Sequence, residues 1–202
     1  GIFPAKIQLM PTMMASWTSP MGSLSFVSCF PAGAIPLFPS PALEGIQPWT
    51  ISAVEYPSLK RIALLTSGGD CPGLNPCIRS VVRTALASGL EVIGIHRGWQ
   101  GLIENDMAGM DARSVAGIVN LGGTVLRSSR CPEFREAEVR QQAALHLAER
   151  EIDGLIVIGG NGSLQGAWEL SRQASLPVIG IPKTIDNDVG GTDYCLGFDT
   201  AV

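Results

Sequence analysis

The feature that most constrains the fold is the segment from Ile156 to Asp188, which reads IVIGGNGSLQGAWELSRQASLPVIGIPKTIDND. An apolar strand pattern runs into a glycine-rich turn, a helical stretch follows, and a second apolar strand leads to Asp186 and Asp188. Glycines at a strand end let backbone N–H groups approach a phosphate without a Cβ in the way, and the helix N-terminus adds partial positive charge there. The segment therefore predicts a phosphate cradle beside two carboxylates, an arrangement suited to moving a phosphoryl group onto an alcohol.

From Lys60 onward, apolar runs of strand length alternate with stretches of helical spacing, which indicates a parallel sheet covered by helices. Asn75 is a preferred N-cap residue and Pro76 suits the first helical position, so we expect a helix to begin there. Gly98 and Gly101 indicate a glycine-rich loop. The expected strands are 61–66, 91–95, 153–158 and 178–181, and the expected helices are 75–89, 111–120, 136–151, 163–173 and one that begins near 200.

Glycine recurs at the carboxyl ends of the expected strands. This pattern predicts an α/β fold with a doubly wound, mainly parallel sheet, and it places the ligand crevice at those strand ends. We expect residues 60–202 to form an incomplete, C-terminally truncated domain, because a new helix should begin just before Val202. Residues 1–59 carry only three charged side chains, and their apolar residues do not recur with the period of a strand or of a helix. We therefore expect them to be unstructured or a non-native leader.

Composition narrows the class of protein further. The chain has 202 residues, of which 46% are hydrophobic and 16% are charged, so it can bury a core. A net charge of −4 and a pI near 5.2 argue against nucleic acid as a partner. Five cysteines without a C-x-x-C pair suit a reducing cytoplasm. No unbroken apolar run reaches about 18 residues, so we expect no membrane partner.

The motifs of residues 60–202 resemble those of a known family. The motifs are LLTSGGDCPGLN, GGTVLRSSRCPEFR, VIGGNGS, PKTIDND and GTDYCLGFDTA, and together they resemble the N-terminal part of 6-phosphofructokinase. The resemblance implies transfer of a phosphoryl group from ATP, with Mg²⁺, to the 1-hydroxyl of fructose 6-phosphate, a step of glycolysis. It also implies a cytoplasmic homo-oligomer, a dimer or a tetramer. The chain as given would lack the half that supplies most sugar-phosphate contacts, so we expect it to be inactive alone.

The resemblance also assigns catalytic roles. Asp186 would be the general base that accepts the proton of the sugar hydroxyl. Thr184 and Ile185 would line the sugar pocket, and the Thr184 hydroxyl would bind the transferring phosphoryl group. Arg130 would neutralise the charge that develops on that group, since a guanidinium is a donor fork suited to phosphate.

Further residues would hold the nucleotide if the resemblance is carried over. Gly69 would offer its N–H to the terminal phosphate. Trp99 and Cys131 would lie near the nucleotide. Trp99 would lie beside the adenine, or it would equally be a partly buried anchor in its loop. The phosphate chain and the metal would be held by Gly160, Asn161, Gly162 and Ser163. At 161 the family usually has Asp, which approaches Mg²⁺. The carboxamide keeps an oxygen but loses the charge, so we expect Asn161 to hold the ion less tightly.

Two residues bear on the phosphoryl donor. Gly162 is similar to the ATP-dependent branch, in which a side chain at this position would crowd the α-phosphate. Lys183 is typical of the branch that uses inorganic diphosphate, although some ATP users also carry it. We favour ATP, with a diphosphate-dependent enzyme as the alternative.

Two arginines on the first expected helix match a family effector site. Arg79 and Arg83 lie four residues apart, so both can reach one anion, but Asp106 stands where the family has a further arginine of that site. A non-catalytic nucleotide-binding remnant stays open as a second alternative, because of Asn161. A kinase of the NAD kinase type shares a similar glycine loop, but the PKTIDND segment argues against it.

Overall fold

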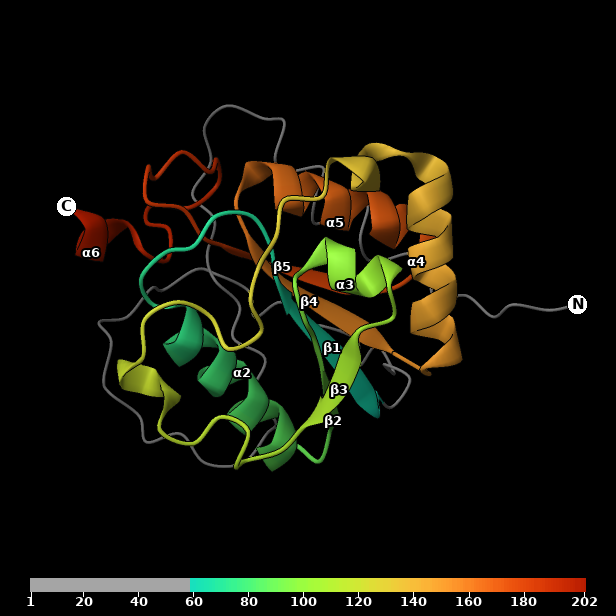
Figure 1. Ribbon diagram of the computed structural model, residues 1–202, viewed down its shortest axis with the longest axis horizontal. Helices are drawn as coiled ribbons and strands as arrows, with labels where there is room; N and C mark the ends of the chain where they lie inside the picture. Colours follow the sequence, from blue (N-terminus) through green and yellow to red (C-terminus); the bar gives the residue numbers. More distant parts are fainter. Residues whose placement is uncertain (1–58) are drawn as a thin grey trace, which may run out of the picture.

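The computed structural model describes residues 59–202, which form a five-stranded sheet flanked by helices (Figure 1). The expectation for residues 1–59 lies outside this described part, apart from Leu59. The strands follow the order β3-β2-β1-β4-β5, and all neighbouring pairs are parallel except β2 with β3. Their bounds are β1 Arg61–Thr66, β2 Glu91–Ile95, β3 Met107–Met110, β4 Gly154–Gly159 and β5 Val178–Pro182.

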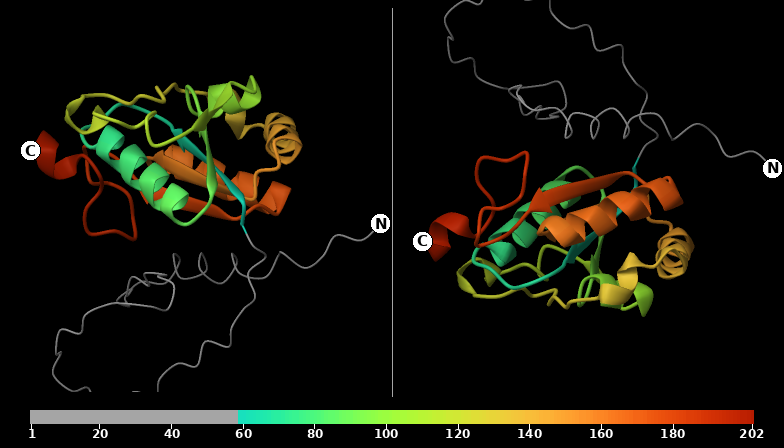
Figure 2. Two further views of the ribbon diagram at one scale, coloured as in Figure 1. Left: turned by 90° about the horizontal axis from the view of Figure 1, so that it is seen from below. Right: turned by 90° about the horizontal axis from the view of Figure 1, so that it is seen from above.

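The helices cover both faces of the sheet, and Figure 1 shows α2 and α4 on opposite sides. Figure 2 places α6 at the margin of the described fold in both views. Within residues 59–202, no helix combines the length and apolar character that crossing a bilayer requires. The helical elements are α2 Leu74–Ala87, α3 Trp99–Ile103, η2 Ile118–Asn120, η3 Pro132–Arg135, α4 Ala137–Glu149, α5 Asn161–Ala174 and α6 Phe198–Ala201.

The central strand β1 explains why both faces need helices. Leu64 packs into the core beneath α2, whereas its neighbour Leu65 packs into the core beneath α3, α4 and α5. Both side chains are fully buried. Successive residues of a strand point to opposite faces, so a continuous apolar run requires cover on each side. The predicted doubly wound, mainly parallel sheet is therefore confirmed.

The strand order also fixes where a ligand crevice can lie. The chain passes from β1 to β2 on one side and later returns to place β4 on the other side of β1. The connections after β1 and β4 therefore diverge, and a crevice forms between them at the carboxyl ends of the two strands. The loops of the expected phosphate cradle follow these two strands.

The structure corrects three local expectations. The helix expected at 111–120 is reduced to the 3-10 helix η2 at its end, after a run of turns. Asn75 is not an N-cap: α2 begins at Leu74 after Gly73, and no side chain caps it. Asn75 is instead buried, where its amide donates to Leu121 O at 3.0 Å and its oxygen accepts from Val125 N at 2.8 Å. The stretch expected as a glycine-rich loop forms the short helix α3, and antiparallel β3, not anticipated, follows it.

Gly101 in α3 provides a test of this packing. A Cβ at Gly101 would lie 1.6 Å from the carbonyl oxygen of His96, whereas a Cβ at Gly109 would meet no heavy atom within 4 Å. We expect Gly101→Ala to lower the free energy of unfolding by about 3 kcal/mol, because the clash is with backbone that must move. Urea denaturation measures the change, and Gly109→Ala is the matched control, expected to alter stability by less than about 1 kcal/mol. Equal effects of the two substitutions would contradict the described position of α3.

Candidate active site

Three loops meet at the carboxyl ends of β1, β4 and β5. The N–H of Ser67, after β1, donates to Ile158 O in β4 at 3.0 Å, and the Ser163 hydroxyl at the start of α5 donates to Ser67 Oγ at 3.0 Å. The N–H of Lys183, after β5, donates to Gly159 O at 3.0 Å. The expected convergence of the glycine loops and the acidic loop is therefore present in the structure.

The N-terminus of α5 is shaped to receive an anion. The helix begins at Asn161, two residues earlier than expected, and its N-cap residue Gly160 has no side chain to bond the first-turn N–H groups. A Cβ added at Gly162, or at Gly69 in the facing loop, would meet no heavy atom within 4 Å. Free first-turn N–H groups beside open space form an anion site. We call Gly69 and residues 160–163 the cradle.

One glycine beside the cradle is required for packing. A Cβ at Gly159 would lie 2.5 Å from the Ser163 Cβ. Side-chain atoms cannot approach so closely, so any larger residue at 159 would displace Ser163 and its bond to Ser67. The glycines of this motif thus divide into two kinds: Gly159 permits close packing, and Gly162 leaves space for a ligand.

Lys183 ties the acidic loop to the loop after β1. Its side chain is 4% exposed, and its ammonium group donates to the carbonyl oxygen of Gly69. Burial lowers the pKa of Lys183, and the neighbouring Cys71 and Asp70 oppose that shift. From the sequence, Lys183 is typical of the branch that uses inorganic diphosphate. The structure gives it a bond within the protein, although an ammonium has three donors and can also serve an anion.

The segment after β5 holds the expected catalytic residues in one exposed turn. Asp186 and Ile185 are exposed, and the N–H of Asp186 donates to Thr184 Oγ1 at 3.2 Å. Asn187 bonds this turn to the chain that follows it. Its side-chain oxygen accepts from Cys195 N at 2.9 Å, and its amide donates to Asp193 O at 3.0 Å. We call residues 184–188 the acidic loop.

Asn161 joins the cradle to the acidic loop. Its amide nitrogen donates to the backbone oxygen of Asp188 at 3.0 Å, and its own oxygen makes no hydrogen bond within residues 59–202. Mg²⁺ takes one or two protein oxygens together with phosphate oxygens and water. No group of three or more His, Cys, Asp or Glu in the described part could hold a metal. Asn161 and Asp188 therefore fit an ion that binds together with phosphates.

The remaining expected nucleotide residues come from the loop before α4 and from α3. Arg130 is exposed, and Cys131 is partly buried, which raises the pKa of its thiol. Trp99 is 4% exposed and stacks on Phe134, with ring centroids 4.1 Å apart. A Cβ at Gly166 of α5 would lie 3.7 Å from Trp99. Trp99 is thus a core anchor beneath α5, and its contact with adenine stays a prediction.

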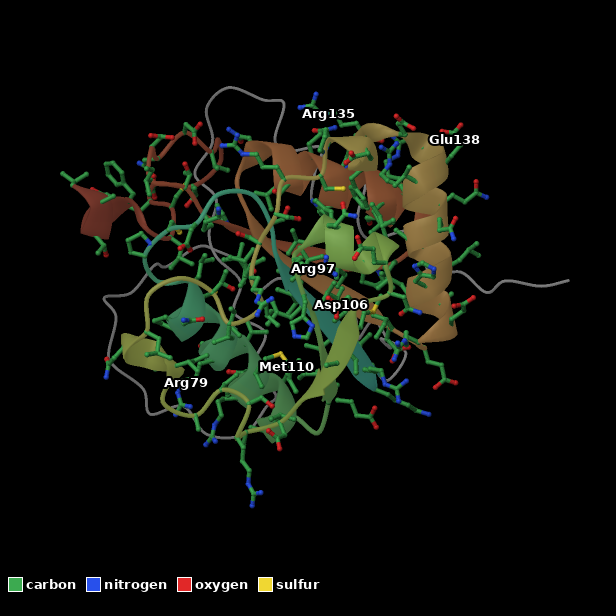
Figure 3. All side chains as sticks on the ribbon, viewed as in Figure 1. Arg79, Arg97, Asp106, Met110, Arg135 and Glu138 are labelled. Carbon is green, nitrogen blue, oxygen red and sulfur yellow. The ribbon has the colours of Figure 1, made fainter. Side chains whose placement is uncertain are left out.

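The two expected effector arginines lie on α2. The Arg79 guanidinium donates to Val115 O at 2.8 Å, and Arg83 is exposed. Figure 3 shows Arg79 near α2, apart from Arg97 and Asp106. Asp106 pairs with Arg97, and within the described part of the chain it makes no contact with Arg79 or Arg83. A shared anion at Arg79 and Arg83 stays a prediction.

Ser67 and Asn187 had no role predicted from the sequence, and for Asp188 only the carboxylate had one. Ser67 links the first loop to α5, Asn187 holds the acidic loop, and Asp188 presents its carbonyl to Asn161. All three lie within motifs that the sequence analysis singled out. Ser67 and Asp188 act through contacts across the crevice and Asn187 through contacts within its own loop, so spacing along the chain carried no signal for them.

Comparison with known proteins agrees with this geometry. The family model described as Phosphofructokinase matches residues 61–202. A curated ATP-dependent 6-phosphofructokinase of Sulfurihydrogenibium sp. is 56% identical over 144 residues, which are 71% of this chain and 44% of that protein. The ATP-dependent 6-phosphofructokinase of Thermotoga neapolitana is 54% identical over 144 residues, 71% of this chain and 45% of that protein. The chain thus spans less than half the length of these relatives.

Solved structures show the same fold. Pichia pastoris phosphofructokinase in the T-state matches with a TM-score of 0.66 and 32% identity, over 77% of this chain and 18% of that chain. A pyrophosphate-dependent phosphofructokinase from Marinobacter aquaeolei matches with a TM-score of 0.62 and 23% identity, over 69% of this chain and 37% of that chain. Because the second match is only 23% identical, it supports the fold and no more.

Proposed function

The chain belongs to the phosphofructokinase family, and we propose that its described residues form the phosphoryl-donor side of an ATP-dependent 6-phosphofructokinase. One observation carries the proposal: the open cradle at the start of α5 is joined to the acidic loop by the Asn161–Asp188 bond. A phosphate chain in the cradle would thus end beside a carboxylate that can accept a proton. The acceptor would be the 1-hydroxyl of fructose 6-phosphate.

The chain's own residues would share the work of the transfer. First-turn N–H groups of α5 and the N–H of Gly69 would hold the phosphate chain, and Arg130 would approach the phosphoryl group as its charge grows. Asp186, exposed at the acidic loop, would take the hydroxyl proton. Asn161 and Asp188 are the residues that would hold Mg²⁺, which when bound would neutralise charge on the donor phosphates. A cytoplasmic location and a homo-oligomeric state rest on the family.

ATP is the donor that the observations favour. The two curated relatives named above are ATP-dependent enzymes, and the space beside Gly162 is open, so an α-phosphate would not meet a side chain. Diphosphate is a second candidate because of Lys183, whose buried ammonium lies against Gly69 O. A compact dianion near that ammonium would gain from the charge without needing room for a nucleoside.

Steady-state assays of a full-length enzyme that carries residues 61–202 test the proposal. Such an enzyme can be made by joining these residues to the remainder of the Thermotoga neapolitana relative. We expect phosphorylation of fructose 6-phosphate with ATP, at a higher kcat/KM than with diphosphate. A folded enzyme that binds ATP but transfers no phosphoryl group would favour the non-catalytic alternative.

A further inference from the structure

A cavity of about 310 Å³ opens beyond the carboxyl end of β2. His96 and Arg97 follow β2, Asp106 precedes β3, and Val125 and Arg127 come from the loop before η3. None of these five residues has a role in the proposed transfer. Figure 3 shows two of them, Arg97 and Asp106, close together beside α3.

Arg97 is held rigidly at this cavity. Its Nε and Nη2 donate to Asp106 Oδ2 at 3.3 and 2.9 Å, and Nη2 also donates to Glu104 at 2.6 Å. Hydrogen bonds from Arg97 and His96 lower the pKa of Asp106, so its carboxylate stays ionised. Nη1 of Arg97 makes no hydrogen bond within residues 59–202. One face of a fixed guanidinium is therefore left for a ligand.

His96 adds a second group with a free nitrogen. Its Nδ1 lies 3.1 Å from Asp106 Oδ1. A carboxylate can only accept, so Nδ1 carries a proton, and Nε2 is left on the ring. Nε2 has no partner in the described part of the chain.

Arg127 is a free cation on a strained backbone. Its side chain is exposed and makes no hydrogen bond or ion pair within the described residues. Its φ is +59°, and that of Arg97 is +57°, a region that residues with a Cβ rarely adopt. Thr66 Oγ1 holds Arg127 by donating to its backbone oxygen at 2.7 Å. Strain of this kind gathers at ligand clamps and switch regions, and here both strained arginines line one cavity.

We propose that this cavity is a second phosphate-binding site, separate from the cradle, which takes a phosphate group as the free ion or as a phosphomonoester. Two guanidinium groups and one carboxylate line it, and Glu104 beside it also pairs with Arg97, so the charge of Arg127 is the one left for a ligand. Free donors come from Arg97 and Arg127 on two separate segments. A tetrahedral dianion can accept from several directions at once, whereas a planar carboxylate is satisfied by one guanidinium fork.

Occupancy of this site would also act on the loop that carries Arg130. The N–H of Arg97 donates to Leu126 O at 2.8 Å, and the hydroxyl of Ser129 donates to Arg97 O at 2.8 Å. The backbone of Arg97 is therefore bonded on both sides of Arg127 in the sequence, to Leu126 and to Ser129. Ser129 is the residue directly before Arg130. A phosphate that bridges the two strained arginines would stiffen this loop. The effect on this loop matters for catalysis only if Arg130 has its proposed role, whereas the binding of phosphate does not depend on that role.

Calorimetric titration of the 202-residue chain with inorganic phosphate at low ionic strength tests the proposal. Gly162→Asp serves as the background, because a carboxylate in the cradle weakens the binding of free phosphate there and so lowers the contribution of the cradle to the titration. In this background we expect Arg127→Gly to weaken phosphate binding by about 10- to 100-fold, the cost of losing charge-assisted hydrogen bonds. Glycine also relieves the positive φ, so thermal unfolding should shift upward or stay unchanged, which separates lost binding from lost structure.

The controls decide between this site and general attraction of anions. Arg113→Gln removes an exposed charge elsewhere and should leave phosphate affinity within about two-fold. Titration with glycerol 3-phosphate distinguishes the two sources, and dependence of either ligand on Arg127 supports the site. Hydrogen exchange should slow at residues 124–130 when phosphate is added. Phosphate binding that survives Arg127→Gly, or that disappears completely in the Gly162→Asp background, would overturn the proposal.

Discussion

Replacing Asp186 with Asn in a full-length enzyme that carries residues 61–202 is expected to lower kcat by about 10²- to 10⁴-fold. The carboxamide keeps the shape of the side chain but cannot accept the proton of the attacking hydroxyl. Asp186 is exposed, and its only described hydrogen bond comes from its own backbone N–H to Thr184, so the fold should not change. Steady-state kinetics with both substrates varied, and thermal unfolding of the variant, measure the two effects.

The KM for ATP should change little, because the cradle belongs to a separate element, the first turn of α5. Asp193→Asn is the matched control: it removes an exposed carboxylate from the same connection after β5 and should leave kcat within about two-fold. If Asp186→Asn mainly raised the KM for ATP, Asp186 would be a donor-binding residue and not the base.

The parts of the fold that were predictable from the sequence are those fixed by burial. β1 is apolar at its four central positions because both of its faces are covered, and its predicted bounds are confirmed. β3 was missed because it has four residues and lies at the sheet edge, with two of them exposed. A short edge strand needs no apolar alternation, so it leaves no period in the sequence.

Side chains whose partners are distant in the sequence were the least predictable. Asn75 has the sequence signature of an N-cap, but its carboxamide bonds the loop at 121–125 instead. Lys183 is charged, yet it is buried against Gly69 O. In each case a partner distant in sequence decides the role, and only the folded arrangement supplies that partner.

The start of α5 shows how local sequence can mislead about a site. Asn161 and Gly162 are poor helix formers, so the sequence placed the helix start at Ser163. The structure begins the helix at Asn161, which makes both residues part of the first turn. This shift matters for function, because first-turn N–H groups point out of the helix and are free for a ligand.

Substituting Asp for Gly162 is expected to shift donor preference from ATP toward diphosphate by several-fold to orders of magnitude in kcat/KM. A Cβ at this position meets no protein atom within 4 Å, so the new carboxylate would occupy the ligand's space and place like charge beside an anion. Diphosphate has no nucleoside-bearing α-phosphate to be crowded, and Lys183 lies close enough to the loop of Gly69 to compensate charge. The measurement is kcat/KM for both donors in parent and variant.

The fold should tolerate this substitution, which keeps the test interpretable. Aspartate in the first turn of a helix is favoured by the helix dipole, and it replaces a glycine that costs helix stability. Thermal unfolding of Gly162→Asp should therefore not be lowered. Gly162→Ala adds a methyl group without charge, so it measures the steric part alone, and the difference between the two variants measures the electrostatic part. A parent enzyme that already prefers diphosphate would show that Lys183 outweighs the open space at Gly162, and the assignment of ATP as donor would be wrong.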